Sequence, residues 1–579
     1  MPNRRRLLWI VPIVVVGAAV AYTAWLAWQV QGDLRGAESS VTRLKDSLDD
    51  KDPSSRDAAV AALRADARSA ADRTDGVWWS ALTHVPAVGD DAAGVQAMSS
   101  SLNTIANEGV QPLSDSVQDV DHVLVDGRID VAAVRDLQQP VGQAQRAFAA
   151  AAGDVSGLDS SGYVGPLRSR FQRYASLVDD TAAALGSAEK ATEVLPGVAG
   201  ADGPRDYLLV FQNNAEIRAT GGLPGSWARL HAENGRLQIV QQGTANEFPE
   251  RATPILPLTK AELALHHEPL GTYFHDANFT PDFPRAAELW TARWQEKYPT
   301  QLDGVLSLDP VAMSYLLEGT GPVRVGDLTL TSDNAVEELL NRPYRDLGPA
   351  AQDVLFAKAA RAIFEASTAD LASPMRFVEG LDRAAREGRF LFAPRDPAER
   401  KALAGTRVEG ALTADDGQTP HVDIALNDGT GSKMSYYLRY WADLKAIKCQ
   451  AGQQTLTGSM TLNQNISVAE AAKLPPYLTG GGQFGVHPGK QIVLIPLFGP
   501  YGGTIDHISV NGKSLDDVAQ IVDYRGRPAT VVFAQLSSSK EVVFNWTMTT
   551  GKGQTGNPEL GMTPSIVPGN NDATFKSAC

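Results

Sequence analysis

The first 28 residues contain the feature that most limits what this chain can be. Residues 7–28, LLWIVPIVVVGAAVAYTAWLAW, carry no charged side chain, and Arg4, Arg5 and Arg6 directly precede them. At about 1.5 Å per residue this stretch spans roughly 33 Å as a helix, which is enough to cross the hydrocarbon core of a bilayer. We therefore predict one transmembrane helix at the start of the chain.

The flanks of the apolar stretch predict its orientation. Arginines before the helix favour a cytoplasmic N-terminus, and no second stretch of comparable length follows. Residues 1–28 are thus expected to be a cytoplasmic tip and anchor, in a single-pass plasma-membrane protein whose bulk is extracytoplasmic. A cleaved signal peptide is the alternative. The stretch is longer than a signal core, however, and it ends in Trp25 and Trp28 rather than in an A-x-A site.

Length and charge narrow the classes of function. A chain of 579 residues has room for about three or four domains. The formal net charge is −15 and the pI is near 5.1, and no basic stripe follows the anchor. Nucleic acid is therefore not an expected partner, because its binding proteins need clustered cations.

Cysteine usage leaves two alternatives open. The chain has two cysteines, Cys449 and Cys579. Outside the membrane they can form one disulfide that ties the C-terminus to the body of the protein. The other interpretation is two free thiols. Only one pairing is possible, which favours the disulfide.

Hydrophobic periodicity divides the rest of the chain and predicts a multidomain α+β fold. Residues 29–200 have helical periodicity and are expected to form an extracytoplasmic helical bundle. Residues 203–400 mix strands and helices, with a hairpin at Asn234-Gly235, and predict a central α/β sandwich. Residues 405–550 have a period of two and predict an antiparallel, immunoglobulin-like β-sandwich. Residues 551–579 are expected to be an extended tail.

The densest polar cluster is QNNAEIRATGGLPGSW, residues 212–227, which we expect in one loop after a buried strand. Arg218 can hold a phosphate or carboxylate through two parallel hydrogen bonds, and a Gly-Gly pair can present backbone N–H groups. The alternative is a self-satisfied loop in which Arg218 pairs with Glu216 or Asp282. The candidate ligand-binding residues here are Asn213, Asn214, Glu216, Arg218, Thr220, Gly221, Gly222 and Ser226.

A second polar group precedes a predicted helix. Asn278 and Asp282 are further candidates for ligand binding, and Asp276 and Asp282 are weak candidates for Mg²⁺. Capping of the helix is the alternative role for Asp282. No G-x-S-x-G or H-E-x-x-H motif occurs, so the sequence assigns no catalytic residue.

Long, unusual motifs carry a resemblance to a known family. The segment DYLLVFQNNAEIRATGGLPGSW resembles the signature of a large bacterial family of membrane-anchored proteins of unknown function. FHDANFTPDFP, DGVLSLDPVAMSYLLEGTGPV, NDGTGSKMSYYL and WWSALTHVPAVGDD also fit that family. The resemblance extends from the anchor to about Trp546, and it implies an architecture without an assigned activity.

The order of elements is also distantly similar to the LytR–CpsA–Psr family. That family transfers phosphorylated glycopolymers from a polyprenyl-pyrophosphate carrier to the cell wall. The resemblance implies a phosphotransferase-like activity with Mg²⁺, with Arg218 as a pocket arginine and Asp276 or Asp282 as its acidic partner. The Pro-Arg-Asp element of that family is absent, and IVQQGTANEFPE occupies the equivalent stretch.

Two hypotheses of function follow. In the first, the central domain of a cell-envelope protein binds a phosphorylated or lipid-linked glycan, or a cell-wall polymer, during assembly or attachment of surface polymer. In the second, the protein is a non-catalytic envelope scaffold or adhesion protein. A pocket that holds Arg218, Asp282 and a second cation favours the first, and a closed Arg218 salt bridge favours the second.

Overall fold

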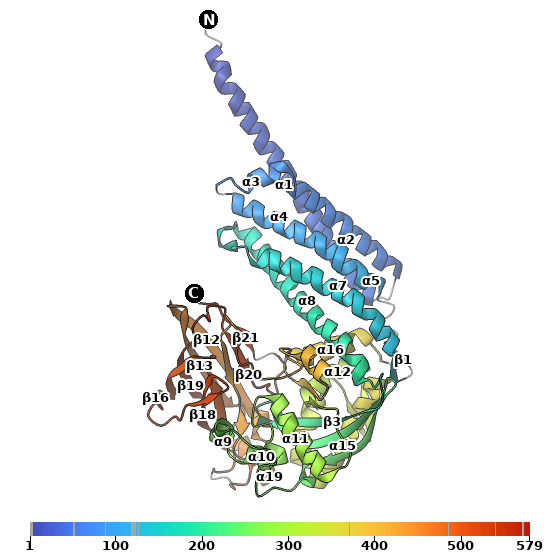
Figure 1. Cartoon of the computed structure of the whole chain (residues 1–579), viewed down its shortest axis with the longest axis vertical. Helices are drawn as coiled ribbons and strands as arrows, with labels where there is room; N and C mark the ends of the chain where they lie inside the picture. The colour runs from blue at the N-terminus through green and yellow to red at the C-terminus, as the bar shows by residue number, and fades with distance from the viewer. Residues whose placement is uncertain are drawn as a thin grey trace. The chain divides into compact units, whose positions relative to one another are not determined.

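The computed structural model describes residues 4–49, 53–86, 88–116, 123–125, 127–369, 371–483, 486–538, 540–569 and 572–579 (Figure 1). Helices and mostly antiparallel sheets are both abundant, so the predicted α+β class is confirmed. The chain forms two compact units. Unit 1 comprises residues 1–123 and 130–196, and unit 2 comprises residues 124–129 and 197–579.

Unit 1 is built from helices, as the periodicity of residues 29–200 predicts. Most are several turns long, and α4 continues into a π-helical turn, η1 (Ile105–Val110). The helices of this unit are α1 (Arg4–Asp49), α2 (Pro53–Thr74), α3 (Val77–Leu82), α4 (Gly89–Thr104), α5 (Gln111–Asp115), α7 (Val131–Ser156) and α8 (Gly165–Val198), with a 3-10 turn, η2 (Ser160–Gly162).

Small side chains let the helices of unit 1 pack closely. Ala37 of α1 contacts a cluster formed by Leu63 and Ala67 of α2 and Ala106 of η1, and each of the four is at most 2% exposed. Alanine loses no side-chain entropy in a helix and keeps neighbouring backbones near each other. The Ala-rich stripes therefore form the core of this unit.

The membrane prediction concerns the start of α1. Within the described residues, no helix has both the length and the apolar character that crossing a bilayer requires. For residues 7–18 and 20, most of the predicted anchor, only the helical backbone is described, so their side chains lie outside the described part. The anchor stays a prediction.

The first part of unit 2 alternates strands and helices. A short hairpin, β1 (Leu124–Val125) and β2 (Arg128–Ile129), belongs to it. The remaining elements are β3 (Arg205–Arg218), β4 (Gly221–Glu233), β5 (Arg236–Thr244), η3 (Ala245–Glu247), α9 (Lys260–His266), α10 (Pro269–Thr272), η4 (Phe274–Asp276), α11 (Phe283–Lys297), β6 (Gly304–Leu308), α12 (Pro310–Thr320), β7 (Val323–Val325), β8 (Leu328–Leu330), α13 (Ala335–Leu340), α14 (Arg342–Asp346), α15 (Pro349–Thr368), α16 (Pro374–Arg386), β9 (Phe390–Pro394) and α17 (Pro397–Leu403).

A five-stranded sheet of order β5-β4-β3-β6-β9 forms the centre of this part. β3 pairs with β6 in parallel, and the other neighbours pair antiparallel. The predicted hairpin joins β4 to β5, with φ of 49° at Asn234 and 82° at Gly235. Positive φ at both positions matches the twist of the two strands and fixes their register.

Helices cover both faces of the central sheet. On one face α11 places Trp294 against Trp227 of β4, with ring centroids 5.1 Å apart. On the other face Met313 of α12 and Ile363 of α15 share a core with Phe211 of β3. Helix, sheet and helix thus form three layers, which is a mixed α/β arrangement.

The second part of unit 2 is rich in strands. Its elements are β10 (His421–Ile424), β11 (Asn427–Asp428), η5 (Met434–Tyr437), β12 (Leu438–Gln450), β13 (Gln453–Gln464), α18 (Val468–Ala471), α19 (Pro476–Thr479), β14 (Gln491–Phe498), β15 (Thr504–Val510), β16 (Lys513–Ser514), β17 (Val522–Tyr524), β18 (Arg527–Leu536), β19 (Val542–Thr549), β20 (Glu559–Met562) and β21 (Ala573–Thr574).

These strands form two sheets that enclose one hydrophobic core. One sheet has the order β17-β18-β14-β10-β20-β21, with β11 beside β14, and the other has the order β12-β13-β19-β15-β16. Phe544 and Trp546 of β19 and Ile495 of β14 are buried between them. The pair β10–β20 is parallel, so the sandwich is not wholly antiparallel as expected. The immunoglobulin-like topology stays a prediction.

The C-terminal residues differ from the extended tail that the sequence suggested. β20 pairs in parallel with β10, from His421↔Glu559 to Ile424↔Met562, and β21 pairs with β20. The backbone of β20 thereby joins a ladder that a solvated tail would lack. A disulfide joins Cys449 to Cys579, whose Cα atoms are 5.1 Å apart.

Candidate functional site

The polar signature lies on strands rather than in the expected loop. β3 continues to Arg218 and β4 begins at Gly221. The β3–β4 ladder passes from the pair Asn213↔Leu223 directly to Ile217↔Gly222, so residues 214–216 bulge out of it. A bulge redirects side chains that a regular strand would alternate between two faces. This bulge takes Glu216 out of the β-ladder.

Glycines make the turn between β3 and β4 possible. Gly221 has φ of 137°, which side chains rarely tolerate. A Cβ on Gly222 would lie 2.2 Å from the carbonyl carbon of Asn213, so only glycine fits there. The two glycines therefore serve the close approach of the strands.

Amide and hydroxyl groups of the signature bond to one another. The Gln212 side-chain oxygen accepts from the Thr220 hydroxyl at 2.9 Å and from Gly222 N and Asn278 Nδ2 at 3.0 Å. Asn278 Nδ2 also donates to the Gly222 carbonyl at 2.9 Å. All four residues are buried. Thr220 and Asn278, predicted as ligand contacts, thus hold the turn instead.

Arg218 is locked inside the protein. Its side chain is only 5% exposed, and Nη2 donates to Glu216 at 3.0 Å and to Asp276 at 3.2 Å. Nη1 donates to the Ile217 carbonyl, and the guanidinium lies 4.8 Å from the Phe279 ring centroid. Of the two predicted internal partners, Glu216 is the one that the structure shows.

Lys433 supplies a second cation. Its ammonium contacts the other oxygen of Glu216 and lies 5.6 Å from the Tyr344 ring centroid. We call Glu216, Arg218, Asp276 and Lys433 the ion cluster. Burial alone would raise the pKa of Glu216, but Lys433 and Arg218 outweigh it and hold that pKa below its usual range. The Glu216 carboxylate is thus kept charged by two cations.

A turn after β11 positions Lys433. Asp428 accepts backbone N–H groups of Thr430 at 3.0 Å and Ser432 at 3.1 Å, and Gln491 donates to it at 2.8 Å. Burial raises the pKa of Asp428, and the charge of Glu216 adds to that effect. A carboxylate that gathers several donors in this way fixes the turn that carries the lysine.

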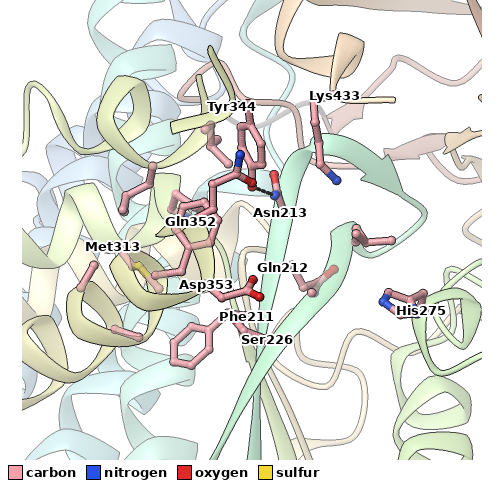
Figure 2. Close-up of a pocket in the computed structure, with 18 of the residues that line it drawn as sticks. Phe211, Gln212, Asn213, Ser226, His275, Met313, Tyr344, Gln352, Asp353 and Lys433 are labelled. Carbon is pink, nitrogen blue, oxygen red and sulfur yellow. Dashed lines mark hydrogen bonds between the residues drawn. The ribbon is translucent and has the colours of Figure 1, made fainter. Parts of the chain in front are cut away.

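A pocket of about 170 Å³ lies beside the ion cluster (Figure 2). Its apolar wall includes Phe211, Met313 and Phe356, from β3, α12 and α15. Polar groups line the rest, and Figure 2 shows Lys433 and His275 flanking the strand that bears Asn213 and Gln212. The polar lining includes Gln212, Asn213, Ser226, His275, Asp353 and Lys433. An apolar wall with one ammonium suits an amphiphile that carries a negative charge.

Uncharged side chains form part of the polar side of the pocket. Burial lowers the pKa of His275 to about 4, and Arg218 and Lys433 add to that effect against Glu216. The imidazole is therefore uncharged near neutral pH and offers one donor and one acceptor. Asn213 donates to the Tyr344 hydroxyl, and both residues line the pocket.

The structure separates the predicted site residues into two groups. Asn213 and Ser226 line the pocket, whereas Asn214 donates to Asp309 at 2.9 Å and is buried. Asp282 does not meet Arg218, because it pairs with Arg525 at 2.7 Å. The prediction that Asp282 orients Arg218 is therefore wrong.

The residues proposed for Mg²⁺ do not fit a metal site. Asp276 pairs with Arg218 and Asp282 pairs with Arg525. Over the described part of the chain, no three His, Cys, Asp or Glu side chains converge on a point that a metal ion can occupy. Two carboxylates that each neutralise a different arginine do not provide an oxygen cage.

Sequence reasoning missed Lys433, His275, Tyr344 and Asp353 as pocket residues. Lys433 lies in NDGTGSKMSYYL and His275 in FHDANFTPDFP, two segments already noted for their unusual sequence. A lysine inside a Gly- and Ser-rich turn was the available signal. The residues near Lys433 in the sequence do not indicate that this turn packs against β3.

Comparison with known proteins gives one match. The model of the family described as "Protein of unknown function (DUF4012)" matches residues 202–344. This segment is therefore similar to that family. No curated protein and no solved structure matches the chain. The matched segment contains β3, β4, Arg218 and Tyr344, while Lys433 lies outside it.

Proposed function

We propose that this protein is a single-pass, membrane-anchored protein of the cell envelope that binds an anionic amphiphile in the pocket of unit 2. The ligand class is a phosphorylated or lipid-linked glycan, used in the assembly or attachment of surface polymer. One observation carries the proposal: the pocket combines an apolar wall with the Lys433 ammonium.

Chemistry at the polar side supports an anion. An ammonium has three donors, and the Glu216 contact uses one. A phosphate oxygen can accept from the remaining donors, and the neutral imidazole of His275 can donate or accept beside it. Arg218 acts indirectly. It pairs with the same carboxylate, Glu216, as Lys433 does, and so it fixes the group that positions the ammonium.

The volume of the pocket restricts the size of the ligand that it can enclose. A volume of about 170 Å³ is below the usual several hundred Å³ of sites that enclose a drug-sized ligand. It accommodates a phosphate with the first isoprene units of a lipid, and the remaining chain or glycan extends outside. The disulfide between Cys449 and Cys579 agrees with an oxidising, extracytoplasmic location.

The scaffold hypothesis remains the second candidate, because Arg218 is closed in a salt bridge and does not line the pocket. The two hypotheses differ in whether the protein binds an anionic amphiphile. Native mass spectrometry of the detergent-extracted protein should show a co-purified isoprenoid phosphate. In titrations, farnesyl phosphate should bind more tightly than farnesol or inorganic phosphate. Equal, negligible binding of all three would leave the scaffold role.

A further inference from the structure

A group of exposed apolar side chains lies at one end of unit 1. Trp25 of α1 is 49% exposed, Trp78 of α3 is 40% exposed and Val77 is 90% exposed. Tyr22 and Trp28 of α1 are exposed as well. Soluble surfaces seldom gather aromatic residues in this way.

Three of these side chains, Tyr22, Trp25 and Trp78, lie next to one another. The Tyr22 and Trp78 ring centroids are 5.6 Å apart, and those of Tyr22 and Trp25 are 5.7 Å apart. The Trp78 indole donates to the Thr23 hydroxyl at 3.1 Å. Figure 1 shows α3 beside α1 at this end of the bundle. We call Tyr22, Trp25, Val77 and Trp78 the aromatic foot.

The short helix α3 also packs against α1 through a buried side chain, Trp79. Trp79 is 4% exposed, and its indole donates to the Ala92 carbonyl at 2.9 Å. It shares a core with Leu26 and Val30 of α1, which are 7% and 1% exposed. Because protein covers α1 at these residues, lipid cannot surround the helix there.

This packing shortens the predicted membrane span. Residues 7–25 precede Leu26, the first α1 residue named in that core, and 19 helical residues extend about 28 Å, close to the thickness of a hydrocarbon core. The aromatic foot then falls at the boundary between lipid and water. Trp and Tyr favour this level of a membrane, because a ring with a polar edge suits both phases.

The distribution of charged residues around α3 agrees with a position at the boundary between lipid and water. Residues 76–89 contain no Asp, Glu, Lys or Arg, whereas Asp75 precedes them and Asp90 and Asp91 follow. An apolar turn bounded by carboxylates can enter the headgroup layer only at its tip. A protein or glycan partner is less favoured, since the surface continues a helix that is itself proposed to enter the bilayer.

We propose that the aromatic foot is a second membrane contact, which rests unit 1 on the outer headgroup layer and stops the anchor helix from tilting freely. The proposal depends on the proposed membrane anchoring. The occupant of this surface is therefore lipid, and its chemistry is that of the interface.

Site-directed spin labelling tests the depth of the foot. The native cysteines form a disulfide, so Val77→Cys provides the single free thiol of the full-length protein. Leu177→Cys on α8, at a residue 61% exposed in the same unit, is the matched control. Both nitroxide-labelled proteins are placed in phosphatidylcholine–phosphatidylglycerol vesicles, and relaxation by oxygen and by a water-soluble nickel complex is compared.

The ratio of relaxation by oxygen to relaxation by nickel should be several-fold higher at position 77 than at position 177. Equal nickel access at the two positions would overturn the inference. So would dipolar broadening at position 77 that disappears on dilution with unlabelled protein, because a second copy would then cover the foot. Failure of the protein to float with the vesicles would instead remove the membrane anchoring itself.

Discussion

Lys433 and Glu216 lie 217 residues apart in the sequence, yet the Lys433 ammonium contacts the Glu216 carboxylate. Glu216 lies in the segment that matches the DUF4012 model, and Lys433 follows the first strands of the β-sandwich. One ion pair therefore joins two parts of unit 2 and places a cation at the pocket.

Removal of the Lys433 charge should destabilise unit 2. Lys433→Met keeps the length of the side chain and leaves Glu216 buried with one cation fewer. Breaking one partner of a buried pair costs about 3 kcal/mol, so the free energy of unfolding in urea should fall by that amount. Lys445→Met, at a side chain 74% exposed, should change it by less than about 0.5 kcal/mol. Equal effects of the two substitutions would contradict the pairing.

Acid should destabilise the protein through its buried histidines. Burial lowers the pKa of His266 from 6.5 to about 4, as it does for His275. Between these values the unfolded chain binds a proton that the folded chain does not, so stability decreases as pH falls from 6.5 towards 4.

The pKa shift of His266 corresponds to about 3 kcal/mol. His266→Gln should reduce the slope of unfolding free energy against pH in this window by about one proton. His267→Asn, at the exposed neighbour whose φ is 58°, is the control and should keep the wild-type slope. An unchanged slope in His266→Gln would show that this residue does not titrate as a buried group.

Filling the pocket should weaken ligand binding without unfolding the protein. Ser226 on β4 lines the pocket, and Ser226→Phe places a ring in its volume of about 170 Å³. We expect at least about a tenfold loss of farnesyl phosphate affinity, equivalent to about 1.4 kcal/mol. Thr329→Phe, on the exposed side of β8, should bind as the wild type does. Wild-type affinity in a folded Ser226→Phe protein would place the ligand elsewhere.

The turn between β3 and β4 should tolerate no side chain. A Cβ on Gly222 would lie 2.2 Å from the Asn213 carbonyl carbon, so Gly222→Ala must displace backbone. We expect a loss of about 3 kcal/mol or more in unfolding free energy. Gly348→Ala, where a Cβ meets no atom within 4 Å, should cost less than about 1 kcal/mol. Similar melting temperatures of the two variants would show that the strands can separate.

The local sequence pattern was sufficient to predict several parts of the fold. The helices of unit 1 follow from periodicity, and the β4–β5 turn follows from Asn234-Gly235, since each depends on residues close in sequence. The C-terminal strands were not anticipated. β20 is four residues long and is specified by its pairing with β10, which lies far earlier in the chain.

The sequence alone determined an uncharged stretch long enough for a membrane, an acidic body and the residue types of the polar signature. Only the tertiary structure decided that Arg218 is enclosed and that Lys433 lines the pocket. The physical reason is that the environment of a charge depends on which distant segments pack around it. Neighbouring residues in the sequence carry no record of that packing.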